Sequence, residues 1–313
     1  MKKNTKKIIV ILGPTASGKT KLAVELAAKF NGEIVSADSR QVYRGMDVGT
    51  GKDLEEFSIF NFQFSKEIQI PYHLIDVADP KKRFDLAQYQ KLAFAAIDDI
   101  LKRGKTPILA GGSGLYLQAV IDNYKLSDIK SDLSLRKKLD KLDAAELFDR
   151  LEKLSPKLAA KLNFSDKNNK RRLIRYLEIL GSGQNFKSRK GKRKYDALLI
   201  GVKYSGEILK QRIFKRLIER LKEQNMIGEV ESLHKRGLAW KKLEEFGLEY
   251  KFIAGYLQHK IEYIEMVEKL NIAIYQFAKR QLTWFSRWEK QGAKIHWLKD
   301  FKKIEKLAKE FLK

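Results

Sequence analysis

The segment from Gly13 to Thr20 matches the phosphate-loop pattern G-x-x-x-x-G-K-[ST]. Its glycines let backbone N–H groups converge on phosphate oxygens at the start of a helix. Lys19 adds a positive charge, and the Thr20 hydroxyl is a suitable ligand for Mg²⁺. An apolar run, 8–12, precedes the motif and a helix-like run, 21–28, follows it. This context favours a phosphate site over a glycine turn that binds nothing, but it leaves the phosphate compound open.

Two further polar segments follow apolar, strand-like runs. Asp38 to Gln41 come after 33–37, and Gly111 to Ser113 come after 106–110. Ligands bind beyond the carboxyl ends of the strands in open parallel sheets, so we expect both segments to meet the phosphate loop in one crevice. Asp38 is a candidate general base by its position there. Its alternative roles are to cap a helix or to contact Mg²⁺ indirectly.

The elements that position these residues alternate between strand and helix, as in α/β proteins. Strands are predicted at 8–12, 33–37, 73–77, 106–110 and 197–202, and a helix at 86–101. The strand signal is absent between about 123 and 194, where Asp143 and Glu146 have capping-box spacing and Ser155-Pro156 opens another helix. We therefore predict an α/β fold with a phosphate-loop parallel-sheet core, an inserted all-helical domain and a helical C-terminal part. The expected boundaries are 1–122 and 195–313 for the core and 123–194 for the insertion.

The composition indicates a folded globular protein with a polyanionic partner. The chain has 313 residues, of which 43% are apolar, and a net charge of +25. A basic excess of this size most often accompanies nucleic-acid binding, although a lysine-rich proteome is an alternative explanation. The absence of cysteine excludes disulfides, thiolate zinc sites and cysteine nucleophiles. The four histidines lack metal-ligand spacing and are interpreted as structural.

The lysine-rich start of the chain superficially resembles a signal peptide. The apolar run that follows is too short for one and leads directly into the phosphate loop, so it is assigned to the first strand. No run approaches the roughly 18 apolar residues that span a membrane. We expect a cytoplasmic protein without membrane contact.

Basic residues gather on two predicted helices. Arg172 and Arg175 lie three residues apart on an amphipathic helix, 170–180, at a spacing suited to phosphate contacts. The stretch 187–194 has six basic residues in eight and is predicted to be a solvated loop. Near the C-terminus, cations alternate with rings at helical spacing, which is typical of RNA recognition; the residues are Arg280, Trp284, Arg287 and Trp288. The alternative is that both tryptophans belong to the core.

Taken together, these motifs resemble those of tRNA dimethylallyltransferases, also called tRNA isopentenyltransferases. The matching segments keep the order of that family: 13–20, 38–50, 73–77, 111–116, 171–175 and 280–285. The pattern D-S-x-Q-x-Y-x-G-M-D-x-G-T after a phosphate loop is the most specific of them. The resemblance implies transfer of a dimethylallyl group from dimethylallyl diphosphate to N6 of adenosine 37 in the tRNA anticodon loop. It further implies Mg²⁺ as cofactor, the anticodon stem-loop as RNA partner, and a monomer.

The resemblance also suggests site residues. The expected catalytic residues are Asp38, Lys19, Ser113 and Arg216. Thr20 is the expected magnesium ligand. The expected diphosphate-binding residues are Gly13, Pro14, Thr15, Ala16, Ser17, Gly18, Lys19, Thr20, Arg212 and Arg216. The expected tRNA-binding residues are Asp38, Ser39, Arg40, Gln41, Ser113, Arg136, Arg171, Arg172, Arg175, Lys279, Arg280 and Gln281. Arg212 and Arg216 lie one helical turn apart, and a solvated helix face is their alternative interpretation.

Four positions depart from the family pattern. Ser113 replaces a usual threonine but keeps a hydroxyl, and Arg171 replaces a frequent glutamine. Ser205-Gly206 stands where an Asp-Arg pair is usual, and Glu249 to Phe252 replaces the usual G-Y-K/R-E. These departures concern RNA contacts more than the chemistry, because the phosphate loop and Asp38 are retained.

Two other functions compete with the transferase. A phosphate-loop kinase of a small metabolite or a nucleic-acid end would bind ATP in the same loop, and it would need an aspartate at the end of an apolar strand. Asp76 is the candidate for that residue. A non-catalytic RNA-binding module is the second alternative, and it would leave the Asp38 segment without a role.

Overall fold

The computed structural model describes residues 6–61, 66–126, 132–183 and 190–313. It divides the chain into two compact units, one of residues 1–123 with 192–313 and the other of residues 124–191. These boundaries lie within three residues of those expected from the loss of strand signal. The larger unit holds the sheet and the phosphate loop.

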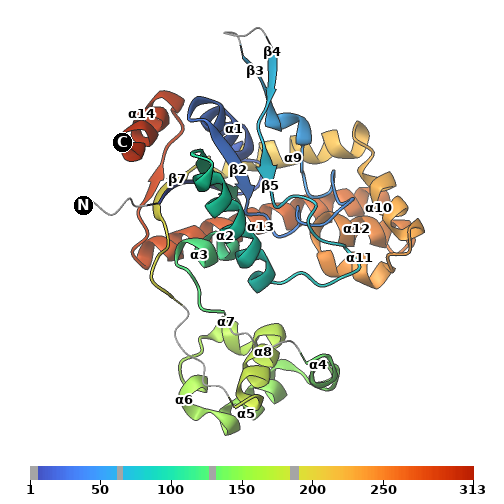
Figure 1. Cartoon of the computed structure of the whole chain (residues 1–313). Helices are drawn as coiled ribbons and strands as arrows, with labels where there is room; N and C mark the ends of the chain where they lie inside the picture. The colour runs from blue at the N-terminus through green and yellow to red at the C-terminus, as the bar shows by residue number, and fades with distance from the viewer. Residues whose placement is uncertain (1–5, 62–65, 127–131, 184–189) are drawn as a thin grey trace. The chain divides into compact units, whose positions relative to one another are not determined.

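The core of the larger unit is a six-stranded parallel sheet (Figure 1). The strands, in order across the sheet, are β5 Tyr72–His73, β2 Gly32–Ser36, β6 Thr106–Gly111, β1 Lys7–Leu12, β7 Asp196–Gly201 and β8 Ile295–Trp297. Val10 on β1 is in register with Leu109 on β6 and Leu199 on β7. These strands are buried on both faces, which explains their continuous apolar runs. The predicted α/β parallel-sheet core is confirmed.

The strand predicted at 73–77 is wrong over most of its length. β5 ends at His73, because Leu74 and Asp76 take left-handed backbone conformations with φ of 65° and 58°. Such angles interrupt a strand, and neither residue is a glycine that would signal them in the sequence. The β8 strand and an antiparallel hairpin of β3 Ser58–Asn61 with β4 Lys66–Gln69 were not predicted.

Helices cover both faces of the sheet (Figure 1). α1 Lys19–Lys29 and α14 Phe301–Leu312 pack on one face, and α2 Leu86–Lys102, α3 Gly114–Ile121 and the C-terminal part of α13 Tyr263–Lys290 pack on the other. A separate apolar cluster joins α13 to α9 Gly206–Lys222, α10 Met226–Lys235, α11 Trp240–Phe246 and α12 Leu248–Leu257. A 3₁₀ turn, η1 Leu54–Phe57, precedes β3. The helical C-terminal part is therefore as predicted, apart from β8.

The smaller unit is helical in its described residues. Its helices are α4 Leu133–Leu139, α5 Ala144–Leu154, α6 Pro156–Ala159, α7 Phe164–Lys167 and α8 Lys170–Gly181. Asp143 and Glu146 form the expected capping box at α5, and Pro156 opens α6. Residues 187–189 of the basic stretch lie outside the described residues. Across both units, no helix in the described part of the chain has the length and apolarity to cross a membrane.

Candidate functional site

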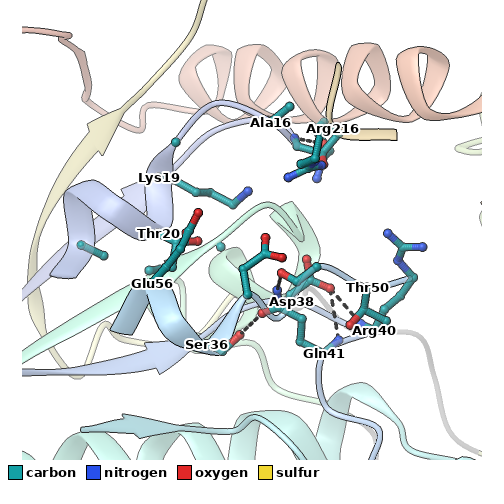
Figure 2. A pocket seen from close by; sticks show the side chains of 18 of the residues that line it. Ala16, Lys19, Thr20, Ser36, Asp38, Arg40, Gln41, Thr50, Glu56 and Arg216 are labelled. Carbon is teal, nitrogen blue, oxygen red and sulfur yellow. Dashed lines mark hydrogen bonds between the residues drawn. The ribbon is translucent and has the colours of Figure 1, made fainter. Parts of the chain in front are cut away.

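The three polar segments expected to share a crevice lie around one cavity of about 300 Å³ (Figure 2). They follow β1, β2 and β6, which are neighbours in the sheet, so their carboxyl ends meet at one edge. The lining residues from these segments are Thr15, Ala16, Gly18, Lys19, Thr20, Asp38, Arg40, Gln41 and Gly111. Ser113 does not line the cavity, but its Oγ accepts a hydrogen bond from the Ser39 N–H at 3.0 Å and so contacts the Asp38 segment.

The phosphate loop presents a positive end to this cavity. Gly18 takes a left-handed conformation, with φ of 78°, and precedes α1 without a side-chain cap. The start of α1 therefore offers the N–H groups and the helix dipole that attract phosphate. The Lys19 ammonium donates to the Pro14 carbonyl at 3.3 Å and points into the cavity (Figure 2). Burial lowers the pKa of Lys19 to about 8, although the Asp38 carboxylate opposes this shift.

Gly13 and Ser17 support the loop from the side away from the cavity. A Cβ on Gly13 would lie 2.5 Å from the carbonyl oxygen of Val202, so only glycine fits there. Ser17 is buried, and its hydroxyl has no hydrogen-bond partner among the described residues. Neither residue lines the cavity.

Two arginines of α9 line the cavity next to the phosphate loop. Arg212 donates from Nε to the Ala16 carbonyl at 2.7 Å, and Arg216 hydrogen-bonds to the Thr15 hydroxyl. Arg220, one turn further along α9, was not predicted, although the spacing of the first two arginines could have indicated it. Arg220 is buried and donates to both carboxylate oxygens of Asp53, at 2.8 and 3.1 Å. Burial, aided by the neighbouring Arg220 charge, lowers the pKa of Arg216 to about 10.

Asp38 lies just beyond β2, and its carboxylate points into the cavity on the side where the Lys19 side chain lies (Figure 2). Its Oδ1 accepts from the N–H groups of Arg40, at 2.9 Å, and Gln41, at 3.4 Å. No helix starts at this turn, so the helix-capping alternative does not apply. The hydrogen bonds orient the carboxylate on its own loop.

The Gln41 side chain is fixed by hydrogen bonds in the part of the cavity lining that also carries Asp38. Its Nε2 donates to the Gly51 carbonyl at 2.7 Å, and its Oε1 accepts from the Ser36 hydroxyl at 3.1 Å. Thr50, Gly51 and Glu56 line the cavity beside it, and none of these three was predicted.

The three C-terminal residues expected to bind tRNA differ in their surroundings. Lys279 and Arg280 are exposed. Gln281 is buried, accepts from the Thr15 N–H at 2.8 Å and donates to the Gly112 carbonyl at 3.0 Å. The interpretation of Trp288 as a stacking surface is wrong, because Trp288 is buried and donates to Asp122 at 3.2 Å.

The arginines of the smaller unit are mostly engaged in ion pairs. Arg136 binds both carboxylate oxygens of the buried Glu178, at 2.5 and 2.6 Å, and Arg175 reaches the same carboxylate at 3.2 Å. Arg172 pairs with Asp166. Arg171 is exposed.

The aspartate that a kinase would need is not placed for that role. Asp76 follows the edge strand β5 and accepts from the buried Lys52 ammonium. The two strands that flank β1 end in Gly111 and Gly201 instead. In the part of the chain that the structure describes, neither strand beside β1 therefore ends in the aspartate that the kinase alternative requires.

Known proteins match this chain over most of its length. The model of a family described as IPP transferase matches residues 41–288. The tRNA dimethylallyltransferase 1 of Syntrophus aciditrophicus is 45% identical over 300 residues, which cover 94% of this chain and 93% of the relative. The tRNA dimethylallyltransferase 1 of Geotalea uraniireducens is 42% identical over 306 residues, which cover 98% and 97%.

Solved structures agree with these matches. The full-length tRNA isopentenylpyrophosphate transferase from Bacillus halodurans is 35% identical with a TM-score of 0.67, over 98% of this chain and 95% of that one. A eukaryotic dimethylallyltransferase acting on tRNA is 28% identical with a TM-score of 0.71, over 90% of this chain and 70% of that one.

Proposed function

This chain belongs to the IPP transferase family, and from that membership we propose that it transfers a dimethylallyl group from dimethylallyl diphosphate to N6 of adenosine 37 in the tRNA anticodon loop. The observation that carries the proposal is the cavity in which Lys19 and Asp38 face each other. Lys19 belongs to a diphosphate site, and Asp38 is a carboxylate able to accept a proton. A prenyl transfer to an amine needs both.

The reaction exchanges one bond for another. The C–O bond between the allylic carbon and the diphosphate breaks as the bond from adenine N6 to that carbon forms. Negative charge grows on the departing diphosphate, where the N–H groups of the loop, Lys19, Arg212 and Arg216 stabilise it. The N6 proton passes to the Asp38 carboxylate. The adenine must leave its stack to reach Asp38 within the cavity.

The residues of the cavity fit a bound Mg²⁺. This ion is usually held by one or two carboxylates together with substrate phosphates. The Thr20 hydroxyl and the Glu56 carboxylate line the same cavity. Among the described residues, no group of three acidic or histidine side chains could hold an ion without substrate. When bound, Mg²⁺ supplies further neutralisation of the diphosphate charge.

We propose that the tRNA contacts come from both units. Ser39, Gln41 and Ser113 form the wall around Asp38. Lys279 and Arg280 expose cations on α13, and Arg136, Arg171, Arg172 and Arg175 belong to the helical unit. The net charge of +25 suits a polyanionic substrate. We propose that the protein acts as a monomer in the cytoplasm, where its tRNA substrate is found.

The test is to incubate the protein with unmodified tRNA, Mg²⁺ and either dimethylallyl diphosphate or ATP. We expect the mass of one dimethylallyl group on the tRNA with the first donor alone, and none on a tRNA whose adenosine 37 is replaced by guanosine. Phosphate incorporation from ATP would instead indicate the kinase. Tight tRNA binding without any added mass would indicate the RNA-binding module.

A further inference from the structure

We propose that Glu249 on α12 is a positioning residue that holds the Asp38 carboxylate in place through Arg40. The inference rests on the proposed function, in which Asp38 accepts the proton. It assigns the Arg40 guanidinium to an ion pair within the protein instead of to a tRNA phosphate. The signature segment that carries Asp38 would then be fixed by helices far away in the sequence.

The ion pair itself is almost dry. The side chains of Arg40 and Glu249 are 16% and 4% exposed, and Nη1 of the arginine binds Oε2 of the glutamate. The guanidinium also lies over the Phe277 ring, with its Cζ 5.7 Å from the ring centroid. An arginine that contributes to RNA affinity by releasing counterions is solvated before the RNA arrives. Drawing Arg40 away to a phosphate would leave a buried carboxylate without its partner, which is strongly unfavourable.

Arg40 connects this ion pair to the reacting group. Its own backbone N–H donates to Asp38 Oδ1 at 2.9 Å, the shorter of the two hydrogen bonds that the carboxylate accepts. Anchoring the side chain of Arg40 therefore fixes the turn whose N–H groups orient Asp38. Arg40 and Asp38 also interact through their charges. Burial disfavours the guanidinium charge and lowers the pKa of Arg40, but the carboxylates of Glu249 and Asp38 favour that charge, and the net effect is a raised pKa.

The neighbouring residue on α12 holds the other end of the same segment. Tyr250 donates at 2.7 Å to Glu229 on α10, whose carboxylate accepts the N–H groups of residues 47, 48 and 49 at 2.8, 2.6 and 3.1 Å. Gly49 lets the Tyr250 ring approach, because a Cβ there would lie 2.8 Å from the ring. The loop continues to Gly51, whose carbonyl holds Gln41. Two adjacent residues of α12 thus hold segment 38–51 near both of its ends. Glu249 binds Arg40 directly, and Tyr250 acts through Glu229.

Four variants test the assignment: Glu249→Gln, Arg40→Lys, Arg40→Met and the double variant Arg40→Met/Glu249→Met. We expect Glu249→Gln and Arg40→Met to lower kcat by about ten- to a hundredfold, the usual effect of a small misplacement of a reacting group. The KM for tRNA should stay within about twofold. Arg40→Lys, which keeps the charge, should recover part of the loss. The double variant should regain thermal stability, because it leaves no charge unpaired, while its kcat stays low.

A matched control comes from the other end of β2. Arg103 pairs there with Glu33, another buried carboxylate. Arg103→Met should lower stability less than Arg40→Met, because Lys105 and His73 still contact Glu33, and it should leave kcat unchanged. If the double variant regains kcat together with stability, the pair is only structural and the proposal is wrong.

The salt dependence of tRNA affinity decides between the two assignments of Arg40 without measuring turnover. Arg40→Met should leave the slope of log Kd against log salt unchanged, whereas removing an arginine that neutralises a phosphate would lower it by about one unit. A lowered slope with retained kcat would overturn the proposal. If the parent protein fails to prenylate tRNA, the proposed function is wrong. The slope of log Kd against log salt for Arg40→Met still shows in that case whether the Arg40 guanidinium contacts a phosphate.

Discussion

The side-chain oxygen of Gln281 accepts a hydrogen bond from the backbone N–H of Thr15 at 2.8 Å. The amide nitrogen of Gln281 donates at 3.0 Å to the carbonyl of Gly112, so one side chain of α13 joins the phosphate loop to the loop after β6. The family resemblance predicted that Gln281 binds tRNA. Its buried position and its two partners support a role in shaping the diphosphate site.

We expect Gln281→Leu to lower the free energy of unfolding by about 1–3 kcal/mol, because it leaves the part-buried N–H of Thr15 and the buried carbonyl of Gly112 without their partner. The Kd for dimethylallyl diphosphate should rise by roughly tenfold, because the hydrogen bond that fixes the N–H groups of the phosphate loop is then absent. Denaturant unfolding and calorimetric titration measure the two effects. Gln276→Leu, an exposed glutamine on the same helix, is the control. A fall in tRNA affinity with unchanged donor binding would restore the original assignment.

The parts of the fold that could be predicted are those that local sequence specifies. β1, β2, β6 and β7 are buried parallel strands, so their apolar runs identify them. β8 has three residues and β5 has two, too few to form a recognisable pattern. The left-handed Asp76 is held by Lys52, a contact across 24 positions that no local motif encodes.

The candidate site divides in the same way. The phosphate loop and the Asp38 segment are contiguous motifs, and the order of the strands brings them together. The supporting residues are not local, since Glu249 is 209 positions from Arg40 and Arg220 is 167 positions from Asp53. A buried ion pair of this kind depends on tertiary packing. The sequence therefore indicates the reacting groups better than the residues that orient them.

The lowered pKa of Lys19 predicts an alkaline limb for donor binding. In the free protein the ammonium loses its proton as the pH rises through about 8, so its charge is present below that pH and lost above it. We expect kcat/KM for dimethylallyl diphosphate to fall above pH 8, by up to about tenfold per pH unit, since this parameter reports the free enzyme. The bound diphosphate raises the pKa of Lys19, so kcat at saturation should hold to higher pH. Initial rates from pH 6.5 to 9.5 test this, and parallel profiles of the two parameters would contradict it.

The helical unit should contribute salt-dependent tRNA affinity. Arg171 is exposed, so Arg171→Ala should lower the slope of log Kd against log salt by about one unit for each phosphate that the arginine neutralises. Arg175→Ala should change it less, because Arg175 already pairs with Glu178. Filter binding from 50 to 300 mM salt measures the slopes, and Lys309→Ala on α14 removes the same charge from the other unit as a control. Equal slopes for Arg171→Ala and the parent would assign the basic excess to the lysine-rich composition of the proteome.

Asp38 should act on the chemical step and not on binding. Asp38→Asn keeps the size of the side chain and an oxygen that can accept from the Arg40 and Gln41 N–H groups, but it removes the ability to take a proton. We expect kcat to fall by roughly 10²–10⁴, the range for a general base, while the Kd values for both substrates change little. Single-turnover rates measure the loss. A tRNA with 2-aminopurine at position 37 shows by its fluorescence whether the variant still unstacks the base. A variant with near-normal kcat, or one that no longer unstacks the base, would show that Asp38 positions the adenine and that another group accepts its proton.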